Sequence, residues 1–206
     1  MPFFQQLYIA DTHVYTWQLT ETVAQLSSGL TLSQREQERL TTLHSEKKQR
    51  EFLAIRHLLQ EAQLPTTVLY YTQEGKPQLE EQYISITHSH DFVMIALSPR
   101  PIGIDIERCT PRILRLAPRF TPWQAPPDMD EPAQIQAYTQ LWTIKEALYK
   151  IADLPSVCFY EDLQVPHFEP LAPQQQALIS HSQGDEVYEV QSFFWEGYVW
   201  SVVSEE

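Results

Sequence analysis

The fold of this chain is indicated most clearly by two short stretches, GIDIE at residues 103–107 and WTIKEALYK at residues 142–150. The first alternates apolar and polar residues, which is typical of a half-buried strand. Because successive side chains of a strand point to opposite faces, Gly103, Asp105 and Glu107 share one face and the isoleucines share the other, which we expect to be buried. Two carboxylates beside a glycine, which would let a ligand approach the backbone, suit a hard divalent cation.

The second stretch has the pattern of a helix that presents Glu146 and Lys150, four residues apart, on one face. A third carboxylate and an ammonium aimed at a metal-bound phosphate would complete a phosphoryl-transfer site. The competing interpretation is an ordinary exposed Glu–Lys pair, because Glu146 lies almost opposite the apolar stripe of this helix. Trp142 and Tyr149 flank the polar face, and two large aromatic residues are unusual on a solvated helix. We therefore expect this face to look into a cleft.

In this order and at this separation, the two stretches resemble the signature pair of the 4′-phosphopantetheinyl transferases of the surfactin-type class, W/KEA branch. The resemblance implies an α+β protein built as two similar halves, with the active site between them. Residues 1–100 would form the half on the adenine and 3′-phosphate side of coenzyme A. Residues 101–206 would form the half that carries the metal site and the catalytic helix.

Within that family, the implied reaction transfers 4′-phosphopantetheine from coenzyme A to a serine of an apo acyl or peptidyl carrier protein, releasing 3′,5′-ADP. The resemblance assigns Asp105, Glu107 and Glu146 to Mg²⁺, for which Mn²⁺ could substitute. Lys150 would neutralise charge that builds on the diphosphate. The serine proton would go either to Glu146 or to a water on the metal, and the sequence leaves both open.

The family also implies residues that hold coenzyme A, in a Gly-Lys-Pro turn at the adenine end, a Ser-His-Ser-type segment and a basic helix. The matching positions in this chain are Gly75, Lys76, Pro77, Thr87, His88, Ser89, Lys47 and Arg50. Without the resemblance, Gly75-Lys76-Pro77 would be interpreted as a turn and His88 as a structural histidine. Lys47 and Arg50 would be part of a solvated helix face. The chain departs from the family at Ile55-Arg56, where a Gly-Arg pair is common, and at residues 121–124, where many relatives have an acidic residue.

Composition narrows the class of protein further. The 206 residues carry a formal net charge of −13, which argues against nucleic-acid binding because that binding requires Lys and Arg. No stretch approaches the roughly 18 apolar residues of a membrane span, and the N-terminus lacks the basic and apolar regions of a signal peptide. Two cysteines form no disulfide framework. We expect a cytoplasmic monomer that binds neither membrane nor nucleic acid.

Periodicity and turn signals predict the secondary structure. Helices are expected at about 33–43, 46–62 and 132–151, and strands at 13–19, 68–72, 83–88, 92–97 and 102–107, with a terminal hairpin of 187–195 and 198–203. Residues 108–131 read as a loose stretch with several prolines.

Two other functions are compatible with parts of this pattern. One is a catalytically inactive relative that acts as a coenzyme A or carrier-protein binding module. The other is an unrelated metal-dependent phosphohydrolase. Such hydrolases usually have histidine-rich or more numerous aspartate ligands, whereas the seven histidines of this chain form no cluster in the sequence.

Overall fold

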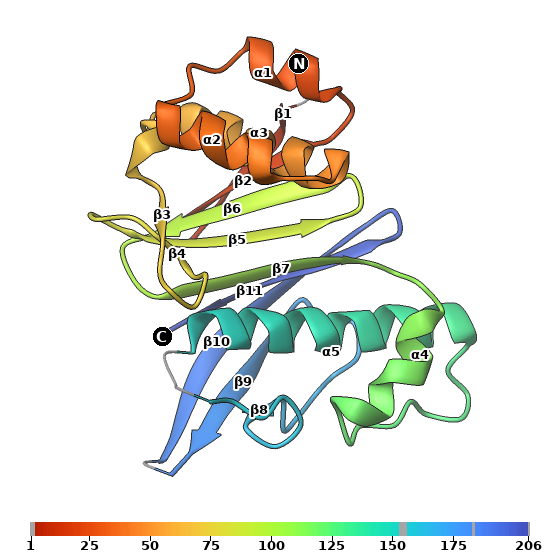
Figure 1. Cartoon of the computed structure of the whole chain (residues 1–206). Helices are drawn as coiled ribbons and strands as arrows, with labels where there is room; N and C mark the ends of the chain where they lie inside the picture. The colour runs from red at the N-terminus through yellow and green to blue at the C-terminus, as the bar shows by residue number, and fades with distance from the viewer. Residues whose placement is uncertain (1–2, 153–155, 183, 206) are drawn as a thin grey trace. The chain divides into compact units, whose positions relative to one another are not determined.

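The computed structural model describes residues 3–152, 156–182 and 184–205. The chain divides into two compact units, Met1–Pro99 and Arg100–Glu206. Each unit combines an antiparallel sheet with a long helix (Figure 1). The predicted α+β class is confirmed. No helix in the described part of the chain has the length and apolar character needed to cross a membrane.

The first unit is built on a four-stranded antiparallel sheet of order β1-β2-β6-β5. These strands are β1 (Phe3–Ile9), β2 (Thr12–Gln18), β5 (Tyr83–Ser89) and β6 (Phe92–Ser98). Helix α3 (Glu46–Glu61) packs on β2 and β6 through Leu53, Leu58 and Leu59, which are fully buried. The apolar residues of α3, which forms at the predicted position, thus supply part of the core of this unit.

Helix α2 (Gln34–Thr42) begins as its sequence predicted. The Ser33 side chain accepts a hydrogen bond from the Glu36 backbone, and the Glu36 carboxylate accepts one from the Ser33 backbone. This capping box satisfies backbone N–H groups that a helix start would leave unpaired. The short helix α1 (Val23–Ser28) has the same kind of cap at Thr22 and was not predicted.

The predicted strand at 68–72 is wrong in its extent. Residues Thr66–Val68 form a 3₁₀ turn, η1, directly after Pro65. Only β3 (Tyr70–Tyr71) is a strand, and it pairs with β4 (Pro77–Gln78) across the predicted turn. Pro65 precedes the turn in an extended conformation, and its carbonyl oxygen accepts a hydrogen bond from the Val68 N–H at 3.2 Å, which closes the turn despite the strand preference of the β-branched residues.

The second unit contains a five-stranded antiparallel sheet of order β7-β11-β10-β9-β8. Its strands are β7 (Ile102–Arg108), β8 (Leu163–Gln164), β9 (Gln174–His181), β10 (Gly184–Trp195) and β11 (Tyr198–Ser204). The predicted terminal hairpin is confirmed as β10 and β11. Helix α5 (Glu131–Ile151) packs on β7 and β11. The loose stretch before it contains a short helix, α4 (Arg112–Leu116), and a 3₁₀ turn, η2 (Ala117–Arg119).

A glycine is needed at position 103 for a different reason from the one that the sequence suggested. A Cβ atom built on Gly103 would overlap the carbonyl oxygen of Ala147 in α5. The glycine therefore admits the backbone of a helix, and the expectation that it admits a ligand is wrong. This close approach brings the functional residues of α5 next to those of β7.

Gly103→Ala is expected to destabilise the protein by about 1–3 kcal/mol or more, because the overlapping atom is backbone and cannot rotate away. The matched control is Gly75→Ala, where φ is +86° but no atom lies within 4 Å of the added methyl. The control therefore carries only the conformational cost, about 1 kcal/mol. Urea unfolding of both variants measures the difference, and equal losses would contradict the packing argument.

Candidate active site

Four polar side chains meet where α5 lies on β7. Asp105 and Glu107 come from the strand, and Glu146 and Lys150 come from the helix. The Lys150 Nζ donates hydrogen bonds to Asp105 Oδ1 at 2.7 Å and to the Ile104 carbonyl oxygen at 2.8 Å. The Lys150 side chain is 26% exposed and that of Asp105 is 8% exposed, so this ion pair is largely shielded from water. We call these four residues the acid cluster.

The pKa of Glu146 is raised to about 7 by burial, and the negative charges of Asp105 and Glu107 raise it further. The positive charge of Lys150 opposes this shift. Mutual repulsion of this kind requires the three carboxylates to be close together. The interpretation of Glu146 and Lys150 as an ordinary exposed pair is therefore wrong. A group with a pKa near 7 can take or give a proton at neutral pH.

The donor chemistry of the acid cluster fits a hard divalent cation, because Mg²⁺ prefers carboxylate oxygens. A cation would also relieve the repulsion that raises the pKa of Glu146. In the described part of the chain, however, no group of three or more His, Cys, Asp or Glu side chains is arranged to hold a metal ion. The Lys150 ammonium instead provides the counter-charge next to Asp105. The suitability of the acid cluster for a divalent cation thus rests on the type of its donor atoms and on its negative charge.

The aromatic residues of α5 have a packing role. Trp142 contacts the rings of Phe120 and Phe159, with centroids 5.0 and 5.3 Å away, and Tyr149 also contacts Phe159. Packing explains Trp142, whereas Tyr149 is 49% exposed despite its ring contact. The cleft at this helix face stays a prediction. Lys145 is buried among the same residues, where its Nζ donates to the carbonyl oxygens of Phe120 and Phe159. Burial lowers the pKa of Lys145 to about 8.

Residues of the unusual segment 121–124 line a cavity of about 590 Å³ in the second unit. Thr121, Pro122 and Trp123 contribute to it, together with Val165 and Phe168. The Trp123 ring makes edge contacts with Tyr138 and Phe168, both at 5.0 Å. In this segment, Trp123 therefore has a packing role.

A larger cavity, of about 790 Å³, lies in the first unit and is called here the α2–α3 cavity. Its wall comes from α2, α3, η1, β3 and the turn after β3, with His88 of β5. Cationic and aromatic side chains share this wall; they are Arg35, Arg39, Lys48, Arg56, Phe52, Tyr70 and Tyr71. Such a lining can bind an anion that also carries a flat ring, because cations pair with the charge and aromatic faces stack on the ring.

Of the residues predicted to hold coenzyme A, Gly75 and His88 line the α2–α3 cavity. Thr87 and Ser89 are buried on the opposite face of β5, as strand alternation requires. Lys76 and Pro77 belong to the β3–β4 hairpin and are not among the lining residues.

Lys47 and Arg50, the two cations predicted on α3 to hold coenzyme A, lie outside the α2–α3 cavity. Lys47 is 57% exposed and pairs with Glu51 at 3.6 Å, and Arg50 donates to the Leu19 carbonyl oxygen. Glu51 Oε1 also lies 3.4 Å from His88 Nδ1. Neither Lys47 nor Arg50 is among the residues that line the cavity.

Sequence reasoning missed Arg35 and Arg39, which line the α2–α3 cavity. They are four residues apart on a helix that was predicted, so their shared face was available as a signal.

A model of the 4′-phosphopantetheinyl transferase superfamily matches residues 101–203, which is half of the chain and contains the acid cluster. The 4′-phosphopantetheinyl transferase psf-1 of Bacillus pumilus is 35% identical over 106 residues, 47% of this chain and 46% of that protein. The transferase gsp of Aneurinibacillus migulanus is 32% identical over 108 residues, 48% and 45% of the two chains.

The transferase Sfp of Bacillus subtilis (strain 168) is 36% identical over 90 residues, 40% of each chain. The matches thus span less than half the length of each of these relatives. They confirm the surfactin-type class that the two motifs predicted. With a family model that covers the whole of β7 and α5, the chain belongs to the 4′-phosphopantetheinyl transferase superfamily.

Proposed function

We propose that this protein transfers the 4′-phosphopantetheine group of coenzyme A to a serine of an apo acyl or peptidyl carrier protein and releases 3′,5′-ADP. The observation that carries this proposal is the acid cluster. Asp105, Glu107 and Glu146 interact electrostatically, Lys150 is paired with Asp105, and all four lie within the segment that the family model matches. Three carboxylates and an ammonium are a suitable set for phosphoryl transfer.

In this proposal, Asp105, Glu107 and Glu146 hold Mg²⁺ or Mn²⁺. When bound, the ion would polarise the phosphoryl group under attack and offset the charge of the diphosphate. The serine proton would go either to Glu146 or to a water on the metal. Burial and the neighbouring carboxylates raise the pKa of Glu146 to about 7 in the metal-free site, and a bound cation would lower it again. Lys150 would stabilise the negative charge that develops on the diphosphate as its P–O–P bridge breaks and 3′,5′-ADP leaves, and its bond to the Ile104 carbonyl oxygen restrains the ammonium.

The α2–α3 cavity is the proposed site for the 3′-phosphate and adenine of coenzyme A. Arg35, Arg39, Lys48 and His88 would face the phosphate, and Tyr70 would offer a stacking surface. This replaces Lys47 and Arg50, which the family resemblance suggested and which are absent from the lining. The contacts of Lys76, Pro77, Thr87 and Ser89 with coenzyme A stay predictions, as do the cytoplasmic location and the monomeric state.

The test is to incubate the protein with Mg²⁺, a fluorescent coenzyme A analogue and a panel of apo carrier proteins. We expect at least one carrier to become labelled, and a carrier whose acceptor serine is replaced by alanine to stay unlabelled. Tight coenzyme A binding without labelling of any carrier would instead support an inactive binding module. Hydrolysis of the diphosphate without any transfer would support a phosphohydrolase.

Coenzyme A is expected to bind more tightly than 3′-dephospho-coenzyme A. Charge-assisted contacts contribute about 1.5–3 kcal/mol, so the ratio of dissociation constants should be roughly ten to a hundred. Calorimetry on Arg39→Ala and Lys47→Ala locates the contacts, because only Arg39 lines the cavity. We expect Arg39→Ala to reduce the ratio more than Lys47→Ala does. Equal dissociation constants of the wild type for both ligands would contradict the proposed phosphate site.

Binding of Mg²⁺ or Mn²⁺ is expected to tighten by about tenfold between pH 6 and pH 8. Glu146, with a pKa of about 7, is mostly protonated at the lower pH and mostly ionised at the higher one, and only the ionised carboxylate binds a cation. Calorimetric titration in buffers of different ionisation enthalpy measures both affinity and proton release. In Glu146→Gln this pH dependence should be lost. An affinity of the wild type that is the same at both pH values would argue against Glu146 as a ligand.

A further inference from the structure

A chain of buried hydroxyl groups connects helix α5 to two strands of its sheet. Thr143 Oγ1 of α5 lies 2.8 Å from Ser201 Oγ of β11, and Ser201 Oγ lies 3.0 Å from Ser192 Oγ of β10. Thr143 and Ser201 are fully buried, and Ser192 is 3% exposed. We call these three residues the hydroxyl chain. The proposed reaction assigns no role to any of them.

The direction of the hydrogen bonds in the hydroxyl chain follows from the number of protons. Each hydroxyl has one proton to donate and accepts through its lone pairs. Thr143 donates its proton to the Gln140 carbonyl oxygen at 2.9 Å. Ser201 must therefore donate to Thr143, and Ser192 must donate to Ser201. All three protons are used, so the loss of one hydroxyl leaves its neighbour without an acceptor.

The bond between Thr143 and Ser201 adjoins the acid cluster at both ends. Ser201 is paired with Asp105 in the β11–β7 ladder. Residues directly opposite each other in an antiparallel pair have Cβ atoms about 4.5–5.5 Å apart on the same face of the sheet. Thr143 lies three residues before Glu146 in α5, a spacing that puts both side chains on one side of the helix. The bond therefore joins a neighbour of one proposed metal ligand to a neighbour of another.

Apolar packing restrains the position of α5 less strictly than this bond does. Ile144, Ala147 and Leu148 pack in one apolar cluster with residues of β9, β10 and β11. The hydrophobic effect is non-directional, so such contacts tolerate small shifts of the helix along the strands. A hydrogen bond is limited in both length and angle. Gly103 thus allows the close approach of α5 to β7, and the hydroxyl chain sets the position of α5 along the sheet.

We propose that the hydroxyl chain is a positioning device that holds α5 on β11 so that Glu146 meets Asp105 and Glu107 at one divalent cation. Its three members are positioning residues, which act through the carboxylates and touch neither the cation nor the substrate. This inference rests on the proposed function, because it takes the three carboxylates as ligands of Mg²⁺ or Mn²⁺.

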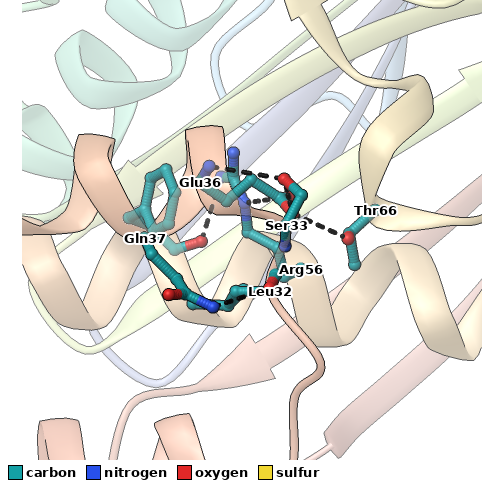
Figure 2. A network of polar contacts seen from close by, with 7 residues as sticks. Leu32, Ser33, Glu36, Gln37, Arg56 and Thr66 are labelled. Atoms are coloured by element: carbon teal, nitrogen blue, oxygen red, sulfur yellow. Dashed lines mark hydrogen bonds and ion pairs between the residues drawn. The ribbon is translucent and has the colours of Figure 1, made fainter.

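The hydroxyl chain is neutral, so it can be broken without unfolding the protein. The buried Glu36–Arg56 ion pair between α2 and α3 differs in this respect, because loss of one partner there would leave a charge unpaired (Figure 2). Loss of one hydroxyl leaves only neutral groups without a partner, which is a smaller penalty. Variants of the hydroxyl chain should therefore fold, and their affinity for a metal ion can be measured.

Thr143→Val removes the hydroxyl and keeps the size of the side chain. We expect the dissociation constant of Mn²⁺, measured by calorimetry at saturating coenzyme A, to rise by about tenfold or more, because groups that orient metal ligands typically contribute about 10–100-fold to metal affinity. The value of kcat should fall by a similar factor. KM for coenzyme A should stay within about threefold of the wild type, because the nucleotide end is proposed to bind in the first unit.

Two further variants separate positioning from simple support of the fold. Thr143→Ser keeps the hydroxyl but removes a buried methyl group, so it should lower the thermal midpoint and retain the Mn²⁺ affinity of the wild type. Thr143→Val/Ser192→Ala/Ser201→Ala leaves no hydroxyl of the chain without a partner. It should recover most of the thermal midpoint that Thr143→Val loses. Its dissociation constant for Mn²⁺ should stay about tenfold above that of the wild type.

Thr139→Val is the matched control. Thr139 is 2% exposed, lies one turn before Thr143 in α5 and donates to the Ile135 carbonyl oxygen at 2.7 Å. Its side chain also shares a hydrogen bond with the Cys109 thiol, and it is not a member of the hydroxyl chain. We expect Thr139→Val to bind Mn²⁺ as the wild type does.

The positioning role would be overturned, with the proposed function left intact, if Thr143→Val bound Mn²⁺ as tightly as the wild type. Equal losses of Mn²⁺ affinity in Thr143→Ser and Thr143→Val would overturn it as well, because the hydroxyl would then not be the group that matters. A wild type that binds no Mn²⁺ would overturn the metal assignment of the acid cluster and this inference with it.

Discussion

Asp105→Asn is expected to reduce transfer to the carrier protein by more than about 10³-fold, because a metal ligand contributes several kcal/mol of charge stabilisation and each 1.36 kcal/mol is a factor of ten. Asparagine keeps the size of the side chain, so the packing of α5 on β7 is disturbed as little as possible. Asp105→Ala should have the same effect on transfer. The measurement is kcat/KM for carrier modification at saturating Mg²⁺.

The control for Asp105 is Asp185→Asn, an exposed carboxylate of β10 in the same sheet that accepts one hydrogen bond from Ser180 at 2.7 Å. It removes one negative charge and alters one hydrogen bond, as Asp105→Asn does, and should transfer at the wild-type rate. Folding is checked by the thermal midpoint of each variant. If a folded Asp105→Asn protein transfers normally in Mg²⁺, the assignment of this strand face to a metal is wrong.

Lys150→Met is expected to lower kcat by about 10²–10³-fold, by analogy with the loss of one preorganised donor. Its effect on stability should be smaller, about 1–2 kcal/mol, because two hydrogen bonds to Asp105 and Ile104 are lost from a site that is partly open to water. This cost exceeds that of an exposed helix pair. The measurement is single-turnover transfer beside the thermal midpoint of the same protein.

Lys150→Arg distinguishes a catalytic role of Lys150 from a purely structural one. Arginine keeps the positive charge and can still bond to Asp105, so the thermal midpoint should return close to that of the wild type. The rate should recover only in part, because a guanidinium spreads its charge over a wider group than an ammonium. A Lys150→Met rate within about threefold of the wild type would show that Lys150 serves only to support Asp105.

The residues of the acid cluster could be predicted from the sequence because their spacing is local. Asp105 and Glu107 are two apart on a strand, and Glu146 and Lys150 are four apart on a helix, so each pair shares a face whatever surrounds it. The sequence did not reveal that Lys150 bonds to Asp105 or that the pKa of Glu146 rises to about 7. Both depend on the distance between α5 and β7, which Gly103 sets by admitting the Ala147 carbonyl.

The cations of the α2–α3 cavity were predicted less well. Lys47 and Lys48 are neighbours on α3, yet only Lys48 lines the cavity. One residue turns a side chain by about 100° around a helix, so the choice depends on how the helix is rotated about its axis. Burial of Leu53, Leu58 and Leu59 against the sheet decides that rotation. Arg35 and Arg39 share a face of α2, but the local pattern does not determine that this face lines a cavity with residues of α3 and β3.

The sequence by itself determined the start of α2, the approximate lengths of α2, α3 and α5, the strands β2, β5, β6, β7, β10 and β11, and which residues of the acid cluster share a face. Each of these follows from patterns whose period is set by the local backbone geometry. The family followed from the resemblance of two motifs and from the comparisons. Only the tertiary structure decided which cations share a cavity, what Gly103 is for and which charges are paired. Those features arise from side chains far apart in the chain, and their distances are set by how α2, α3 and α5 pack.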